Sequence, residues 1–195
     1  MQKLSNLDRK YEDFRWFFTS NNVLVVGGKS DEQNEIALEN FSKPNYIVMH
    51  TTAPGSPFMI IQSDRPTKKD LEETAVFCAC FSQQWKLGKR LIEIDVFAGE
   101  QIYKLKGMKT GTFGLNGTKK TLKVRPELVL VIQNGKLKAV PKTTNQEKLA
   151  EIRQGSLSKL EAAEKISKIV RNKYAFPISK EEILQAIPSD KLSVR

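Results

Sequence analysis

Histidine and cysteine are nearly absent from this chain of 195 residues, which contains one histidine and two cysteines. A structural zinc site draws four ligands mainly from these two residue types, so a closed zinc centre is excluded. Long hydrophobic runs are also absent: none approaches the roughly 18 residues of a membrane helix, and the polar N-terminus is unlike a secretion signal. We expect a cytoplasmic protein with no metal, no other cofactor and no membrane contact.

The single histidine, His50, lies in the segment YIVMHTTAPGSPFMII, where a predicted strand gives way to a loop. Catalysis of the serine-hydrolase type needs a nucleophile and an orienting acid, and no motif of that kind accompanies this residue. Two interpretations stay open: the imidazole donates a hydrogen bond to a loop carbonyl, or it contacts a phosphate or a base. We predict no catalytic residue and no enzyme.

The two cysteines, Cys78 and Cys80, lie in a predicted helix, where two residues span about 200° around the axis. Their thiols therefore point to opposite sides and do not chelate one metal together. We expect two small buried hydrophobic residues, with a reactive thiol as the alternative. Glu93 and Asp95 share one face of a predicted strand; we expect a solvated strand face rather than the paired acids of a nuclease.

Acidic residues are scarce in one part of the chain. Residues 99 to 144 hold ten Lys and Arg against two Asp and Glu, which accounts for +8 of the net charge of +10. A local positive field of this kind attracts polyanions, and lysines on hairpins with interleaved aromatic rings are typical of RNA-binding surfaces. The cations concerned are Lys104, Lys106, Lys109, Lys119, Lys120, Lys123 and Arg125, with Tyr103 and Phe113 among them. An ordinary solvated lysine face remains the alternative.

Aromatic and β-branched runs joined by turn residues predict a β-hairpin over residues 14–28, in which either Arg15 or Trp16 faces outward. Helical spacing predicts a short helix after Ser30 and one long helix over residues 67–87. The Asn116-Gly117 and Asn134-Gly135 pairs predict two further hairpins. The fold class is therefore α+β, with antiparallel hairpins packed around one long central helix.

From about residue 144 the sequence becomes helix-forming, and a capping box predicts a further helix after Ser179. We predict two parts, an RNA-binding domain over residues 1–143 and a short helical C-terminal tail over residues 144–195. The tail is a candidate docking site for a protein partner.

Four stretches together resemble a known family. YEDFRWFFTSNNVLVVGGKSDEQNE is similar to its signature of an aromatic-Arg-Trp-Phe strand, a Gly-Gly corner and then Gln-Asn-Glu. YIVMHTTAPGSPFMII, the helix with Thr74, Ala75, Ser82 and Trp85, and KGMKTGTFGLNGTKK have counterparts in the same order. This is the NFACT-R domain, the RNA-binding module of the NFACT proteins of ribosome-associated quality control. The resemblance covers residues 11 to about 140, although Thr51-Thr52 replace the family's Ala-Asp after the histidine.

The resemblance implies an α+β domain without a known catalytic centre that contacts tRNA or ribosomal RNA, with the large ribosomal subunit as a possible partner. The ten residues before Tyr11 leave no room for the family's preceding domains, so we expect a stand-alone version. We expect RNA contacts from the 99–144 lysines and from the surface around Arg15, Trp16, Lys29 and His50. The alternatives are a protein that presents tRNA to a thiouridine-forming pathway, and an adaptor that binds a protein through its tail.

Overall fold

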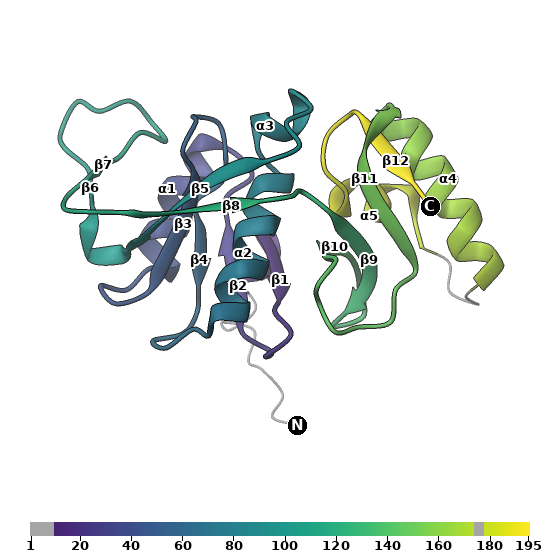
Figure 1. Cartoon of the computed structure of the whole chain (residues 1–195), viewed down its shortest axis with the longest axis horizontal. Helices are drawn as coiled ribbons and strands as arrows, with labels where there is room; N and C mark the ends of the chain where they lie inside the picture. The colour runs from purple at the N-terminus through teal and green to yellow at the C-terminus, as the bar shows by residue number, and fades with distance from the viewer. Residues whose placement is uncertain (1–9, 174–177) are drawn as a thin grey trace.

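The computed structural model describes residues 10–173 and 178–195, which form two lobes lying side by side (Figure 1). Residues 10–125 are called the N-terminal lobe, and the described residues from 126 onward the C-terminal lobe. The strands of the N-terminal lobe are β1 (Arg15–Phe18), β2 (Leu24–Gly27), β3 (Ile47–Thr51), β4 (Met59–Ile61), β5 (Ile92–Ala98), β6 (Ile102–Tyr103), β7 (Gly114–Leu115) and β8 (Lys120–Val124). Its helices are α1 (Asp31–Phe41), α2 (Lys68–Cys80) and α3 (Gln83–Lys86), with two short 3-10 helices, η1 (Lys10–Asp13) and η2 (Gly99–Gln101).

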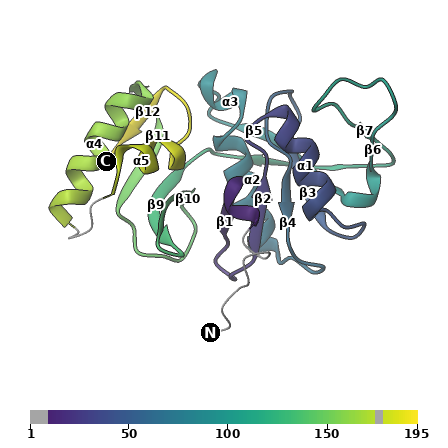
Figure 2. The ribbon, with the colours of Figure 1, turned by 180° about the vertical axis from the view of Figure 1, so that it is seen from behind.

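Six strands of the N-terminal lobe form one sheet in the order β1-β2-β4-β3-β5-β8, and all neighbours are antiparallel. Helix α1 contacts β2 and β4, while α2 contacts β3, β4, β5 and β8. Figures 1 and 2 show these two helices on opposite faces of the sheet. Both faces are therefore covered, which explains the consecutive apolar residues of β3 and β4.

The local predictions for the first hairpin and helix are confirmed. Strands β1 and β2 pair from Arg15↔Gly27 to Phe18↔Leu24, and Asn22 takes a positive φ of 59° in the turn between them. The Ser30 side chain accepts a hydrogen bond from the backbone of Gln33 and so caps α1.

The helix expected over residues 67–87 is broken in two. Helix α2 begins after the Thr67 cap, whose capping box pairs it with Asp70, and ends at Cys80. The Ser82 side chain then accepts a hydrogen bond from Gln84 N and caps the short α3. The helix ends here instead of continuing, because the Ser82 hydroxyl can accept a hydrogen bond from the free backbone N–H groups at the start of a new helix.

The C-terminal lobe is a second antiparallel sheet with helices on it. Its strands β9 (Leu128–Gln133), β10 (Lys136–Pro141), β11 (Ala150–Leu157) and β12 (Leu192–Val194) lie in the order β10-β9-β11-β12, and α4 (Lys159–Lys173) and α5 (Lys180–Ala186) pack against them. Asn134 and Gly135 both take positive φ in the β9–β10 turn, as their sequence predicts. The Ser179 cap of α5 is also confirmed.

The tail is not purely helical. Residues 150–157 form β11 rather than a helix, because pairing with β9 and β12 buries Ala150 and Ile152. The boundary predicted between residues 143 and 144 falls inside the sheet, in the connection between β10 and β11. We propose instead that the two units meet between β8 and β9, near Pro126.

The strands before and after the Asn116-Gly117 pair do not pair with each other, so the predicted hairpin is not formed. Strand β7, before it, pairs with β6, and β8, after it, pairs with β5 at the edge of the large sheet. Strand β8 pairs with β5 rather than with β7, because the longer β5 offers more backbone hydrogen bonds than a two-residue strand can.

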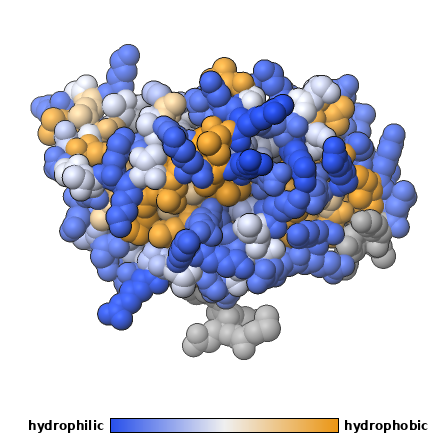
Figure 3. Space-filling view, in the orientation of Figure 1, coloured by the Kyte–Doolittle hydropathy of each residue, from blue (hydrophilic) through white to orange (hydrophobic). Residues whose placement is uncertain are grey.

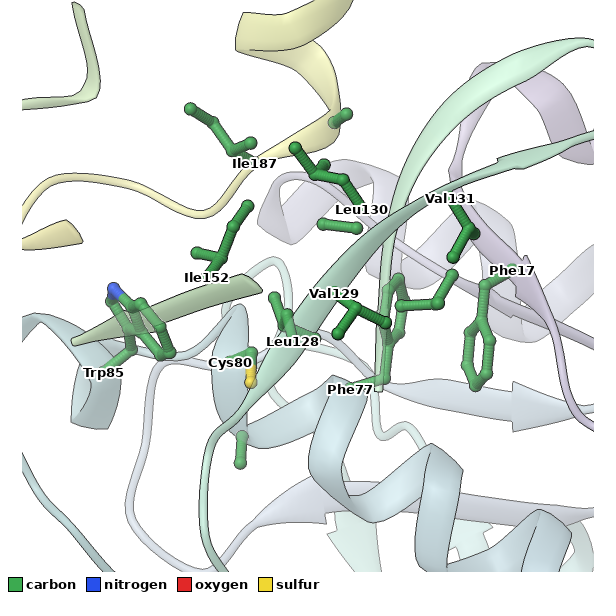
Figure 4. Close-up of a cluster of buried hydrophobic side chains, with 14 of the residues drawn as sticks. Phe17, Phe77, Cys80, Trp85, Leu128, Val129, Leu130, Val131, Ile152 and Ile187 are labelled. Atoms are coloured by element: carbon green, nitrogen blue, oxygen red, sulfur yellow. The ribbon is translucent and has the colours of Figure 1, made fainter. Parts of the chain in front are cut away.

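Of the two clusters of buried hydrophobic residues, one lies within the N-terminal lobe and the other runs through both lobes. Figure 4 shows Phe17, Phe77 and Cys80 of the N-terminal lobe packed among residues of β9 and β11. Helix α2 contacts β10 as well as the large sheet, so it lies between the two sheets. The α+β class is confirmed, but α2 with 13 residues is shorter than α4 with 15, and there is not one long central helix.

Candidate nucleic-acid interface

The segment between β6 and β7 carries three of the predicted lysines, and we call residues 104–113 the lysine loop. In Figure 1 it projects at the end of the molecule opposite the C-terminal lobe. Lys104 is fixed inside it: its ammonium pairs with Glu35 of α1, donates to Lys109 O at 3.0 Å and lies 4.9 Å from the Phe113 ring centroid. Gly111 N also donates to Glu35, so α1 holds the loop in place.

Two further lysines of the predicted set neutralise acids of β5. Lys123 Nζ lies 2.9 Å from Glu93, and Lys119 pairs with Asp95, which is only 5% exposed. Burial alone would raise the pKa of Asp95, but hydrogen bonds from Lys119, Thr52 and Thr121 outweigh it and lower the pKa. The solvated acidic face expected from the sequence is wrong for Asp95, because β8 and the loop after β3 cover it.

The remaining predicted cations have no ion-pair partner within residues 10–173 and 178–195. These are Lys106 and Lys109 of the lysine loop, and Lys120 and Arg125 on and after β8, all of them exposed. Strand alternation turns Lys120 to the face of Leu122 and Val124, opposite Lys123. The adjacent lysines 119 and 120 therefore do not form one patch.

His50 contacts a backbone carbonyl, as the first of its two interpretations predicts, but this carbonyl belongs to the last residue of β3 rather than to the loop. Its Nδ1 lies 2.6 Å from Thr51 O, and its ring stacks on Phe58 with centroids 4.5 Å apart. Burial lowers the pKa of His50, against smaller opposing effects of the Thr51 carbonyl and Asp95. The neutral imidazole packs at the end of β3, between the Thr51 carbonyl and the Phe58 ring.

The aromatic residues proposed for base stacking are packed inward. Trp16 is 1% exposed, with Tyr11 at its edge and Lys138 Nζ 3.9 Å from its ring centroid, so the expectation that it contacts RNA is wrong for this conformation. Phe113 packs on Phe58 at 5.2 Å and Tyr103 lies against Gly114, both half-buried. Between Arg15 and Trp16, it is Arg15 that reaches accessible space.

Arg15 and Lys29 lie close to each other beside the C-terminal lobe. The Arg15 guanidinium lies 4.1 Å from the Phe81 ring centroid, and Lys29 Nζ donates to Asp13 O at 2.8 Å. Burial lowers the pKa of Lys29, and Arg15 lowers it further. Sequence reasoning missed three further cations here, Lys86 of α3 and Lys138 and Lys159 of the C-terminal lobe, because their spacing along the chain carries no signal of a shared site.

Both cysteines are buried and free, as expected from the sequence. Burial raises the pKa of Cys78 to about 12 and raises that of Cys80 as well. They lie on opposite sides of α2, yet both are buried because the helix is covered by a sheet on each side. A reactive thiol for sulfur transfer has no support in this arrangement.

Within the described part of the chain, no group of three or more His, Cys, Asp or Glu side chains lies close enough to hold a metal ion. No helix of that part is long and apolar enough to cross a membrane. The face shown in Figure 3 is largely hydrophilic with hydrophobic side chains between, a mixed surface rather than a continuous apolar one.

A family model described as "NFACT protein RNA binding domain" matches residues 13–117, more than half of the chain. The sequence is 31% identical to the archaeal Rqc2 homolog aRqcH of Methanocaldococcus jannaschii, over 96% of this chain and 30% of that protein. It is 29% identical to the ribosome quality control complex subunit NEMF homolog of Drosophila melanogaster, over 57% of this chain and 12% of that protein. The chain thus spans less than a third of the length of these curated relatives.

Among solved structures, the C-terminal part of the fibronectin/fibrinogen-binding protein from Streptococcus suis superposes with a TM-score of 0.54 at 20% identity. The match covers 64% of this chain and 48% of that one, and it supports the fold alone.

Proposed function

The chain belongs to the family of the NFACT protein RNA-binding domain, and on that premise we propose that it is a non-catalytic module that binds tRNA or ribosomal RNA in the cytoplasm. Two relatives that match it are named as subunits of the ribosome quality control complex, one from Drosophila melanogaster and one from Schizosaccharomyces pombe. We infer that this chain also works with the ribosome, with the large subunit as a partner.

The observation that carries the proposal is the set of exposed cations without an ion-pair partner among the described residues. Lys106, Lys109, Lys120 and Arg125 project from the lysine loop and β8, where a phosphate backbone can reach them. Lys104, Lys119 and Lys123 of the same segments already face Glu35, Asp95 and Glu93. An unpaired lysine gains a full counter-charge from a phosphate, whereas a paired one must first give up its carboxylate.

The test compares two triple variants that remove the same charge. We expect K106Q/K109Q/K120Q to lower the affinity for RNA at least about tenfold. The slope of the logarithm of the binding constant against the logarithm of the salt concentration should become less steep by about one for each lost phosphate contact. The matched control is K165Q/K168Q/R171Q on the exposed side of α4. Fluorescence anisotropy with labelled tRNA and with a ribosomal RNA fragment, at several salt concentrations, measures both quantities.

Equal losses in the two triple variants would mean that net charge alone attracts RNA, and the proposed surface would be wrong. A wild-type affinity that does not change between low and moderate salt would reject phosphate-based binding altogether. The two RNAs, compared at one salt concentration, distinguish tRNA from ribosomal RNA as the target.

The contacts of the C-terminal tail give little support to the alternative that it docks a protein partner. Helices α4 and α5 contact each other and the strands β10, β11 and β12, so their apolar sides cover the lobe's own sheet. The adaptor hypothesis is therefore not supported by these contacts, because the helices use their apolar sides within the lobe.

A further inference from the structure

A cleft of about 660 Å³ opens between the two lobes, within the range of about 300–1,000 Å³ typical of ligand sites. Residues from β1, from the loop after β2 and from α3 line one side, and residues from α4 and the segment after α5 line the other. In Figure 2, β1 and α3 lie at the side of the N-terminal lobe that faces the C-terminal lobe. The cleft therefore exists only while the lobes are packed together.

Arg15 provides the central charge of this cleft. The Arg15 side chain is half-buried, and its Nε is buried without a hydrogen-bond partner among the described residues. The Phe81 ring packs on the guanidinium, and the Nη groups, which are not buried, form no hydrogen bond with any of the described residues. Burial lowers the pKa of Arg15 to about 10, so the group stays charged at neutral pH.

The other charges of the cleft are mostly of the same sign. Lys29, Lys86 and Lys159 also line it, against Asp31 as the lining acid. Burial and the charges of Arg15 and Lys86 lower the pKa of Lys159, while Asp190 opposes this effect. Asp13 and Asp190 partly compensate Lys29 and Lys159, but no carboxylate within residues 10–173 and 178–195 forms an ion pair with any of the four cations.

A buried Nε–H group without an acceptor destabilises a fold, because its desolvation is not offset by a hydrogen bond. A packing role does not require this charge, because a methionine would fill the same space over Phe81. The missing partner is an anion with several acceptor oxygens. A phosphate group has this chemistry and matches the planar donors of arginine.

We propose that the cleft between the lobes binds one phosphate group of the RNA, with Arg15 as the central donor and Lys29, Lys86 and Lys159 around it. The inference rests on the proposed RNA-binding function, and it adds a second contact point that requires the C-terminal lobe. Its cations are different from those of the lysine loop, although Asp31 of the cleft also lies against Gly111 of that loop.

The first experiment uses inorganic phosphate with the full chain. In an NMR titration at fixed ionic strength, we expect phosphate but not chloride to shift the Nε–Hε signal of Arg15. Arg15→Met and the double variant K86Q/K159Q should each weaken phosphate binding at least about tenfold, as the loss of a charged hydrogen bond predicts. K109Q/K120Q, outside the cleft, is the matched control and should leave phosphate binding unchanged.

The second experiment measures RNA affinity of the same proteins. Arg15→Met and K86Q/K159Q should lower it severalfold, in addition to the effect of the lysine-loop triple variant. A 5′-phosphorylated oligoribonucleotide and its 5′-hydroxyl counterpart distinguish a terminal phosphate from one inside the backbone. Tighter binding of the phosphorylated RNA would indicate the terminal phosphate, whereas equal binding of the two RNAs would indicate a backbone phosphate.

The outcomes separate this inference from the proposed function. Intact RNA binding without any phosphate effect on Arg15 overturns the inference and leaves the proposed function standing. Phosphate binding in the cleft of a protein that does not bind RNA rejects the RNA source of the phosphate and the proposed function together.

Folding of the variants is checked by urea unfolding. We expect Arg15→Met to unfold at the same or a higher urea concentration than the wild type, because the uncompensated charge serves binding and not the fold. A clear loss of stability in Arg15→Met would assign Arg15 a structural role, and the K86Q/K159Q variant, altered at accessible side chains, then decides the phosphate site alone.

Discussion

Lys138 on β10 and Arg15 on β1 each hold a positive charge over an aromatic ring, Trp16 and Phe81 respectively. Burial is the main reason that the pKa of Lys138 falls to about 7, and Lys29, Arg15 and Lys136 lower it further, against Glu12. Its neighbours Arg15 and Lys29 belong to the cleft between the lobes. At the scale of single residues, this part of the molecule thus concentrates positive charge that the fold does not neutralise.

Lys138 should make the stability of the protein depend on pH. Its pKa is lower in the folded state than the usual 10.5, so between about pH 7 and 10 the unfolded state binds more protons and stability rises with pH. We expect Lys138→Met to remove about 1–2 kcal/mol of this rise between pH 7 and 9. Urea unfolding at both pH values measures the effect.

Lys165→Met, on the exposed side of α4, controls for the loss of one surface charge. The same gain of stability with pH in the wild type and in Lys138→Met would contradict the lowered pKa.

At the scale of elements, α2 is the helix that packs against both the large sheet and the sheet of the C-terminal lobe. Its first two turns are also tied to the β1–β2 turn: Asp70 accepts from Thr19 Oγ1 at 2.6 Å, and Glu73 accepts from Ser20 N at 2.8 Å. Asp70 and Glu73 are buried, at 1% and 0% exposure. The acids of this helix therefore position it against the first hairpin, beside Phe81 and the cleft.

Asp70→Ala should destabilise the protein by about 2–3 kcal/mol, because it removes half of the capping box and leaves Thr19 without its acceptor. Burial would raise the pKa of Asp70, but hydrogen bonds from Thr19, Thr67 and Asn21 lower it overall. Its contribution is thus present at neutral pH and is lost as the pH falls through that lowered pKa. Urea unfolding at pH 7 and at pH 3 tests both statements.

The matched control is Glu72→Ala, at an exposed position two residues further along the same helix. A change below about 0.5 kcal/mol in Asp70→Ala, as in an ordinary surface substitution, would contradict the role of this cap.

At the scale of the whole molecule, the two lobes share one core and are joined by polar contacts. Gln133 of β9 accepts from Phe18 N and donates to Phe18 O, both at 2.8 Å, so its amide completes the edge of β1. Gln154 of β11 donates to Trp85 O, and Trp85 Nε1 donates to Asp190 O. These contacts fix the width of the cleft that separates the lobes.

The N-terminal lobe should not fold alone. A chain ending at residue 126 would expose the side of α2 that carries Phe77 and Cys80, now buried against β9. We expect such a fragment to lack a cooperative unfolding transition and to bind the dye ANS. Co-expression with residues 127–195 as a separate chain is the control and should restore both properties.

A cooperative transition of the fragment alone, at the denaturant concentration of the full chain, would show that the lobes are independent. The same packing means that deletion of residues 145–195 does not test an adaptor role cleanly, because it removes β11 and β12 from the sheet.

The sequence by itself determined the features that depend on neighbouring residues: the first hairpin, the capped helices α1 and α5, the Asn134-Gly135 turn, the α+β class and the family. Hydrogen bonds and turn dihedrals a few residues apart suffice for these. Only the tertiary structure decided which lysines face acids, that Trp16 is buried, and that residues 150–157 form a strand. Such outcomes depend on contacts between distant segments, as in the pairing of Lys119 with Asp95 or the strand beside Ile152. The cleft around Arg15 belongs to this second group, since its cations come from four separate parts of the chain.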